Sequence, residues 1–236
     1  FGAGIVFYNA YLPEIATEDR YDDVSAKGYA FGYIGSVILL LIVLLMISFY
    51  DKIGLSSEAM AIRLGFILVG VWWLAFASIT FKVLPPDSKS GFNSALFRKG
   101  FHELRSVYLL ITANKYITRF LAAYFFYIAG VNVIIYLASI FAKDELGFES
   151  SQLIILILLL QFLATIGAYF FAWVSDKRGN KISLLIQIAV WIFICVFAYL
   201  TQSIFHFYIL AAFVGLVFGG IQSLSRSSYA KFIDDR

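Results

Sequence analysis

The chain has 236 residues, of which 61% are hydrophobic and 14% are charged, and its formal net charge is +3. Soluble domains carry roughly a quarter of charged residues, so this composition excludes an ordinary soluble domain and indicates a membrane protein with several spans. The single cysteine, Cys195, excludes a disulfide within the chain, and its place in an apolar run predicts a buried thiol.

Six apolar stretches are each long enough to cross a bilayer as an α-helix. In chain order they cover about 29–49, 63–84, 119–142, 152–174, 182–200 and 205–224. Residues 1–12 have the composition of the end of a further helix. The sequence therefore predicts an all-α polytopic membrane protein, and we expect the chain to be an internal part of a longer protein, without a signal peptide.

The basic residues are divided unevenly between the two sides of the predicted membrane. When the sides alternate along the chain, 15 of the 18 Lys and Arg residues fall on one side. Because Lys and Arg accumulate in cytoplasmic loops, we expect this side to face the cytoplasm. The segments on it are about 11–28, 82–119, 176–181 and 225–236.

The longest cytoplasmic connection, about 85–116, opens with Pro85 and Pro86, which predict the end of the preceding helix. An apolar stripe at helical spacing follows in this connection. It is formed by Phe97, Phe101, Leu104 and Tyr108. We interpret the stripe as one face of an amphipathic helix that links two bundles, with a helix that senses anionic lipids as the alternative.

Small and polar residues inside the spans are candidates for helix packing or for solute binding. Asn132 and Tyr136 share one face of the third span, and Gln222 and Arg226 share one face of the last. For these residues the sequence leaves packing and solute contact both open. The glycines that share a face at the start of the first span, where we expect a neighbouring backbone to pack closely, are Gly28, Gly32 and Gly35.

Groups that would carry catalysis are missing from the sequence. It contains no nucleophile elbow, no phosphate-binding loop and no cluster of metal ligands. His102 lies in the predicted surface helix and His206 near an outer loop, so we expect both to be solvated or interfacial residues and not ligands. We therefore expect no enzymatic activity, no cofactor, no metal and no nucleic-acid partner, and a bilayer and a small-molecule substrate as partners.

A short charged segment, DKRGNK at 176–181, joins two spans on the predicted cytoplasmic side. Gly179 permits the chain to reverse, because glycine accepts backbone angles that other residues avoid. The basic residues Lys177 and Lys181 help to keep the loop in the cytoplasm. Asp176 is not explained by topology, and its contacts are expected to tie helices together in one state and release them in another.

The loop resembles a motif of the major facilitator superfamily, G-x-x-x-D-R/K-x-G-R/K-R/K, in its degraded copy between helices 8 and 9. The positions of the motif are occupied here by Ala172, Asp176, Lys177, Gly179, Asn180 and Lys181. Ala172 replaces a glycine and Asn180 replaces a basic residue. The resemblance implies a partial helical bundle that runs from the end of helix 4 to helix 10, with 85–116 as the central cytoplasmic loop.

The segments FYNAYLPEIA at 7–16 and GGIQSLSRS at 219–227 narrow this resemblance to the vacuole-effluxer family, the autophagy-related amino-acid effluxers. Segment 7–16 also echoes SRSSYAKFID at 225–234, as in a transporter with repeated halves. The family implies secondary transport by alternating access, with amino acids or similar small polar solutes as substrates. A proton is the candidate coupling ion. It implies the bacterial inner membrane, with the vacuolar membrane as the alternative location.

The resemblance also implies a division of the chain and a set of site residues. Residues 1–84 would belong to an N-terminal bundle, 85–116 to the central loop and 117–236 to a C-terminal bundle. The residues expected to bind substrate are Asn9, Asn132, Tyr136, Gln222, Ser223 and Arg226. The residues expected to form a gating loop are Asp176, Lys177, Gly179 and Lys181. A receptor or scaffold that keeps the transporter fold but does not transport is the alternative function.

Overall fold

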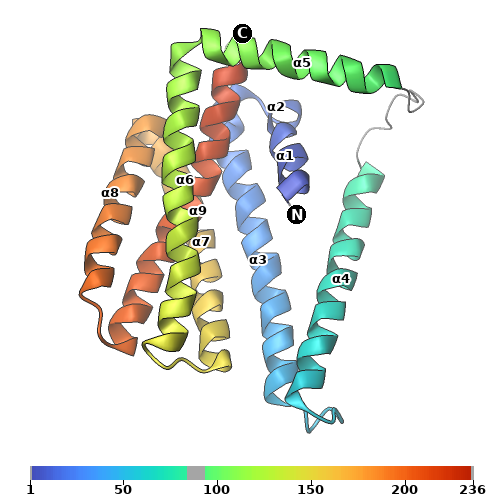
Figure 1. Cartoon of the computed structure of the whole chain (residues 1–236), viewed down its shortest axis with the longest axis vertical. Helices are drawn as coiled ribbons and strands as arrows, with labels where there is room; N and C mark the ends of the chain where they lie inside the picture. Colours follow the sequence, from blue (N-terminus) through green and yellow to red (C-terminus); the bar gives the residue numbers. More distant parts are fainter. Residues whose placement is uncertain (1, 84–93, 235–236) are drawn as a thin grey trace. The chain divides into compact units, whose positions relative to one another are not determined.

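The computed structural model of the chain describes residues 2–83 and 94–234, and every regular element in these ranges is helical (Figure 1). Pro85 and Pro86 lie outside the described residues. The helices are α1 (Gly2–Ala10), α2 (Leu12–Ile15), a 3-10 helix (Glu18–Arg20), α3 (Tyr21–Ser48), α4 (Glu58–Val83), α5 (Ser94–Ala113), α6 (Lys115–Asp144), α7 (Ser150–Arg178), α8 (Asn180–Tyr199) and α9 (Ile204–Asp234).

Six of these helices, α3, α4, α6, α7, α8 and α9, are long and apolar enough to cross a membrane. The six predicted spans are therefore confirmed, and the chain is an integral membrane protein with several passes. Two helices continue well past their apolar stretches, because backbone hydrogen bonding does not stop where hydrophobicity does. Helix α3 begins at Tyr21 instead of near 29, and α9 ends at Asp234 instead of near 224.

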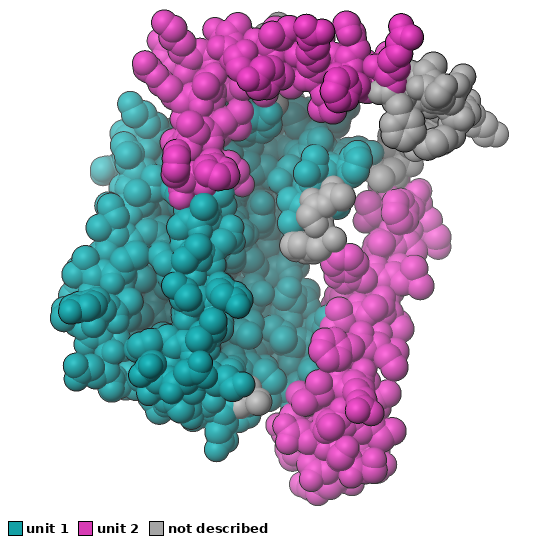
Figure 2. All heavy atoms as spheres, in the orientation of Figure 1, with its two compact units in different colours: residues 1–45, 127–236 teal, residues 46–126 magenta. Residues whose placement is uncertain are grey.

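The chain divides into two compact units (Figure 2). The first contains residues 1–45 and 127–236, and the second contains residues 46–126. The first unit thus takes helices from both of the segments that the sequence assigns to separate bundles. The division into bundles stays a prediction, but the contacts of α3 with α7, α8 and α9 all lie inside the first unit.

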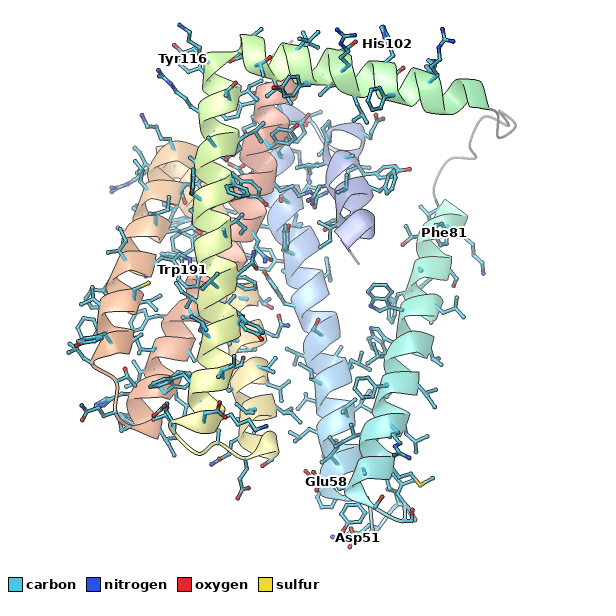
Figure 3. The ribbon with its side chains drawn as sticks, viewed as in Figure 1. Asp51, Glu58, Phe81, His102, Tyr116 and Trp191 are labelled. Carbon is cyan, nitrogen blue, oxygen red and sulfur yellow. The ribbon has the colours of Figure 1, made fainter. Side chains whose placement is uncertain are left out.

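In the first unit, α7 and α9 pack backbone against backbone. A Cβ atom added at Gly219 of α9 would collide with the backbone of Ala164, and one added at Gly167 of α7 would collide with that of Leu216. Only glycine permits so close an approach of two helices in a membrane. Helix α8 lies against the same pair (Figure 1), and Trp191 on α8 is buried (Figure 3).

Helix α3 meets α7 through small side chains. Ala26 packs against Ala168 and Ala172 of α7, and all three are buried. Ala172, which stands where the superfamily motif has glycine, therefore faces another alanine. The expectation for the α3 glycines was wrong in part, since a Cβ added at Gly32 or Gly35 would meet no described atom within 4 Å.

In the second unit, α5 forms the amphipathic helix that the sequence predicted. Phe101, Leu104 and Tyr108 are all exposed on it, whereas the side chain of Phe97 lies outside the described residues. The side chain of Asn114 accepts hydrogen bonds from the first amides of α6 and so caps that helix. His102 on α5 is exposed (Figure 3), and His206 is exposed as well, as expected for solvated or interfacial residues.

The outer faces of the helices expose many large apolar side chains. Phe66 and Leu74 of α4 are 73% and 75% exposed. Soluble proteins do not expose apolar surface on this scale, whereas lipid covers it in a membrane. The prediction of a buried thiol was wrong, because Cys195 on α8 is exposed. An apolar run does not by itself distinguish a position that faces protein from one that faces lipid.

Candidate functional site

An acidic residue at the start of α3 is the centre of a polar network. Asp22 is only 3% exposed. Its carboxylate accepts hydrogen bonds from Ser175 Oγ of α7 at 2.9 Å and from Asn180 Nδ2 of α8 at 2.8 Å. The ammonium group of Lys231, on α9, forms an ion pair with it at 2.9 Å. Three helices thus converge on one carboxylate from α3, and these contacts offset the cost of burying its charge.

Asn180 links the members of this network to each other. Its Oδ1 accepts a hydrogen bond from Lys231 Nζ at 2.7 Å, and its Nδ2 also donates to Ser228 Oγ at 3.0 Å. An amide can donate and accept at once, which a basic side chain cannot do. The replacement of the basic motif residue by Asn180 is therefore suited to this site, where Lys or Arg would face the ammonium of Lys231.

Local structure places each member of the network. Asp22 lies in the first turn of α3, where the helix dipole favours a negative charge. Gly179 separates α7 from α8 by a single residue and has a φ of 81°, which confirms the predicted reversal at this glycine. The reversal sets Ser175, in the last turn of α7, close to Asn180, the first residue of α8.

Further polar contacts join α3 to α9 beyond this network. Ser25 Oγ donates to the backbone carbonyl of Ser223 at 2.8 Å, and Tyr33 Oη donates to Gln222 Oε1 at 2.8 Å. Ser25 and Ser223 are fully buried. We call the polar contacts between α3 and α9, including the ion pair of Asp22 with Lys231, the α3/α9 seam.

Arg226 of α9 lies beside the seam and contacts α1. It is 8% exposed, its Nη2 donates to the Tyr8 carbonyl at 3.1 Å, and its Cζ lies 4.2 Å from the centre of the Tyr8 ring. A Cβ atom added at Gly28 would collide with the Tyr8 hydroxyl and lie 3.5 Å from Arg226 Nη1. The missing side chain of Gly28 therefore leaves room for both groups.

The structure brings together some of the residues expected to bind substrate. Gln222, Ser223 and Arg226 lie together on α9, and Asn9 directly follows the residue whose carbonyl accepts from Arg226. Asn132 and Tyr136 are exposed on α6 and form no hydrogen bond with the described part of the chain. Their contact with substrate stays a prediction.

The residues expected to form a gating loop surround the network without entering it. Asp176, Lys177 and Lys181 are exposed, and Lys177 Nζ lies 4.1 Å from the centre of the Trp173 ring. Among the described residues, Asp176 forms no ion pair. The contacts of the loop region come from the neighbours Ser175 and Asn180, and the gating role of the four loop residues stays a prediction.

Sequence reasoning missed Asp22, Ser175, Lys231 and Tyr8. A signal for α3 was present, because Asp22, Ser25 and Tyr33 fall on one helical face that continues upstream of the apolar run. It was overlooked because residues 11–28 were assigned to a loop. The described residues contain no group of three or more His, Cys, Asp or Glu that could hold a metal ion.

The long helices and the motif loop between α7 and α8 define the class: an all-α polytopic membrane protein with part of a major facilitator helical bundle. The family described as "Vacuole effluxer Atg22 like" matches residues 1–234, and the chain belongs to this family.

Curated relatives include bacterial and fungal proteins. YxiO of Bacillus subtilis, described as an MFS-type transporter, is 32% identical over 100% of this chain and 55% of its own length. Autophagy-related protein 22-1 of Aspergillus niger is 26% identical over 89% of this chain and 37% of its own length. The chain thus spans about half or less of these relatives. No solved structure matches it significantly.

Proposed function

We propose that the chain is part of a secondary active transporter that works by alternating access and moves amino acids or similar small polar solutes across a membrane. Support comes from the family and from the bacterial relative, which is described as an MFS-type transporter. That relative also favours the bacterial inner membrane, whereas the fungal relatives favour a vacuolar one. A proton is the proposed coupling ion.

The observation that carries the proposal is the buried network around Asp22. It joins α3, from the predicted N-terminal bundle, to α7, α8 and α9, from the predicted C-terminal bundle. Alternating access requires contacts between bundles that form in one state and separate in another. Charged and hydrogen-bonded groups suit this requirement, because water replaces their partners when they separate.

We infer from this that the loop of Asp176, Lys177, Gly179 and Lys181 acts as a latch on the predicted cytoplasmic side. Its neighbours Ser175 and Asn180 supply the contacts, and Asp22 is the acid that they hold. The solute is proposed to bind between the bundles, on helices 4, 7 and 10 of the superfamily. The residues proposed to contact it are Asn9, Asn132, Tyr136, Gln222, Ser223 and Arg226.

The test is transport by the full-length protein that contains this chain, reconstituted in liposomes. Uptake and efflux of radiolabelled amino acids are measured with and without a proton gradient. We expect flux of at least one amino acid that a gradient accelerates and that Asp22→Asn changes more than the matched control Asp23→Asn. A folded preparation that binds amino acids without moving them would support a receptor instead, and one that moves no amino acid would remove the substrate assignment.

A further inference from the structure

The guanidinium of Arg226 is buried without an acidic partner. None of the ion pairs formed by the described residues includes Arg226. Its Nε is buried and has no hydrogen-bond partner, although a guanidinium carries five N–H donors. A cation inside a membrane protein is costly, and such residues ordinarily pair with one another or contact transported solutes. The seam supplies an acid to Lys231 but not to Arg226.

Further unpaired polar groups lie close by. Gln222 precedes Arg226 by one helical turn on α9, and its Oε1 is occupied by the Tyr33 hydroxyl, which leaves the amide N–H groups of Gln222 available. Asn9 adjoins the carbonyl that accepts from Arg226, and its Oδ1 is buried without a partner. The region therefore holds spare donors on α9 and a spare acceptor on α1.

Aromatic rings complete the surroundings of this cation. The ring centres of Tyr8 and Tyr29 lie 6.4 Å apart, and those of Tyr29 and Tyr33 lie 6.3 Å apart. Tyr33 in turn lies 6.4 Å from Phe218. Rings present an apolar face to an aliphatic group and a negative face to an ammonium group. A solute whose carboxylate meets Arg226 would have such faces around the rest of the molecule.

We propose that Arg226 binds the carboxylate of the transported solute, with Gln222 as a second donor and Asn9 Oδ1 as the acceptor for an ammonium group. Guanidinium and carboxylate match in planar, two-point hydrogen bonding, which an ammonium cannot reproduce. The site thus selects carboxylates over the corresponding carboxamides. This inference rests on the proposed transport function and adds to it the group by which the solute is recognised.

A different role for Arg226 gives different expectations. If the contact with Tyr8 only clamps α1 to α9, then Arg226 contributes to stability and not to ligand choice. Replacing the Tyr8 ring would then reproduce the effect of replacing Arg226. The Arg226 side chain would not distinguish between ligands that differ only in their carboxylate. Binding of a series of ligands to the wild-type protein distinguishes carboxylate recognition from a purely structural role of Arg226. This comparison does not depend on whether a variant folds.

The experiment measures ligand binding to the purified full-length protein by isothermal titration calorimetry. The probes are L-leucine, 4-methylpentanoate, which lacks the ammonium group, and L-leucinamide, which lacks the carboxylate. Their side chains are the same, so the charged group is the variable. We expect wild-type protein to bind both carboxylates and to bind leucinamide at least about tenfold more weakly. Equal affinity for leucine and leucinamide would overturn the proposal.

Variants then assign the effect to the residue. Arg226→Gln should weaken binding of both carboxylates by about 30-fold or more, because a buried charge pair loses one member. Arg226→Lys keeps the positive charge but not the planar guanidinium that forms two parallel hydrogen bonds. Its loss of carboxylate affinity should therefore lie between those of wild type and Arg226→Gln. Arg63→Gln, which changes an exposed arginine on α4, is the control. Unchanged carboxylate binding in a folded Arg226→Gln protein would overturn the proposal, as would an equal loss in Tyr8→Leu.

Failure of the inference and failure of the transport function have different signatures. If wild-type protein transports leucine and leucinamide alike, transport stands and the carboxylate inference fails. If carboxylates bind in an Arg226-dependent way but none crosses the liposome membrane, the inference stands as a binding site and transport fails. If no probe binds and none is transported, both are overturned.

Discussion

Helix α9 makes two contacts of opposite character. Against α7, Gly219 and Gly167 let the two backbones touch. Against α3, side chains carry the contact, through the ion pair of Asp22 with Lys231 and the hydrogen bonds of Ser25 and Tyr33. When two packed backbones separate, their van der Waals contacts are lost without replacement. Hydrogen-bonded groups that separate can instead form hydrogen bonds with water. The comparison indicates a permanent crossing on one side of α9 and a separable seam on the other.

The largest effect is expected at the permanent crossing. Gly219→Leu places a side chain where even a Cβ collides with the Ala164 backbone, so we expect it to lower the free energy of unfolding by ~1–3 kcal/mol or more. Thermal unfolding in detergent measures this loss. Gly32→Leu on α3 is the control, because a Cβ there meets no described atom within 4 Å. Equal stability of the two variants would contradict the tight crossing.

The next effect concerns the seam and changes conformation more than stability. Asp22→Asn removes a charge-assisted contact worth ~1.5–3 kcal/mol, which corresponds to a roughly 10- to 100-fold shift toward the open seam. The reporter is the maleimide labelling rate of Ser25→Cys, a fully buried position, with Cys195→Ser in the background.

The matched control for this prediction is Asp23→Asn. The side chain of Asp23 is 42% exposed and pairs with Lys27 on its own helix, a contact worth at most ~1 kcal/mol. Labelling that rises equally in both variants, or in neither, would show that Asp22 does not hold the seam closed.

A smaller effect is expected from the hydrogen bond of Tyr33. Tyr33→Phe keeps the ring against Phe218 but removes a hydrogen bond to Gln222 that is worth ~0.5–1.5 kcal/mol. Labelling at Ser25→Cys should therefore rise by roughly two- to tenfold. Tyr116→Phe, on an exposed ring, should leave the rate unchanged (Figure 3). If Tyr33→Phe leaves the labelling rate at wild-type level, the hydrogen bond between Tyr33 and Gln222 does not help to hold the seam closed.

The smallest effect is expected at Asp176. It is exposed and forms no ion pair among the described residues, so Asp176→Asn should change the labelling rate by less than about threefold, in line with surface substitutions. An effect as large as that of Asp22→Asn would mean that Asp176 has its partner in another state of the molecule. That result would mean that the Asp176 side chain itself makes contacts of the latch, in addition to those of Ser175 and Asn180.

The spans, their order and the turn at Gly179 could be predicted because each depends on residues close together in the sequence. The seam could not, since its partners are 198 residues apart for Ser25 with Ser223 and 209 for Asp22 with Lys231. The sequence identified Asn180 as a departure from the motif, but its role becomes clear only beside the ammonium of Lys231.

Glycine patterns show the same limit. The spacing of Gly28, Gly32 and Gly35 predicts a small face on α3, and only Gly28 has close neighbours, which are side chains and not a backbone. The tight crossing instead uses Gly219 on α9 and Gly167 on α7. Spacing along one helix identifies a face that permits close approach, but the partner is decided by packing in three dimensions.

The two segments that echo one another, 7–16 and 225–234, lie against each other. Tyr8 contacts Arg226, and Leu12 shares a buried cluster with Ala230. Both pairs are separated by the same 218 residues. A position that touches its own counterpart is what a two-fold symmetry axis produces where it passes between two copies of a segment. The predicted repeat of two halves would place its symmetry axis at these contacts, with a tyrosine in one copy and an arginine in the other.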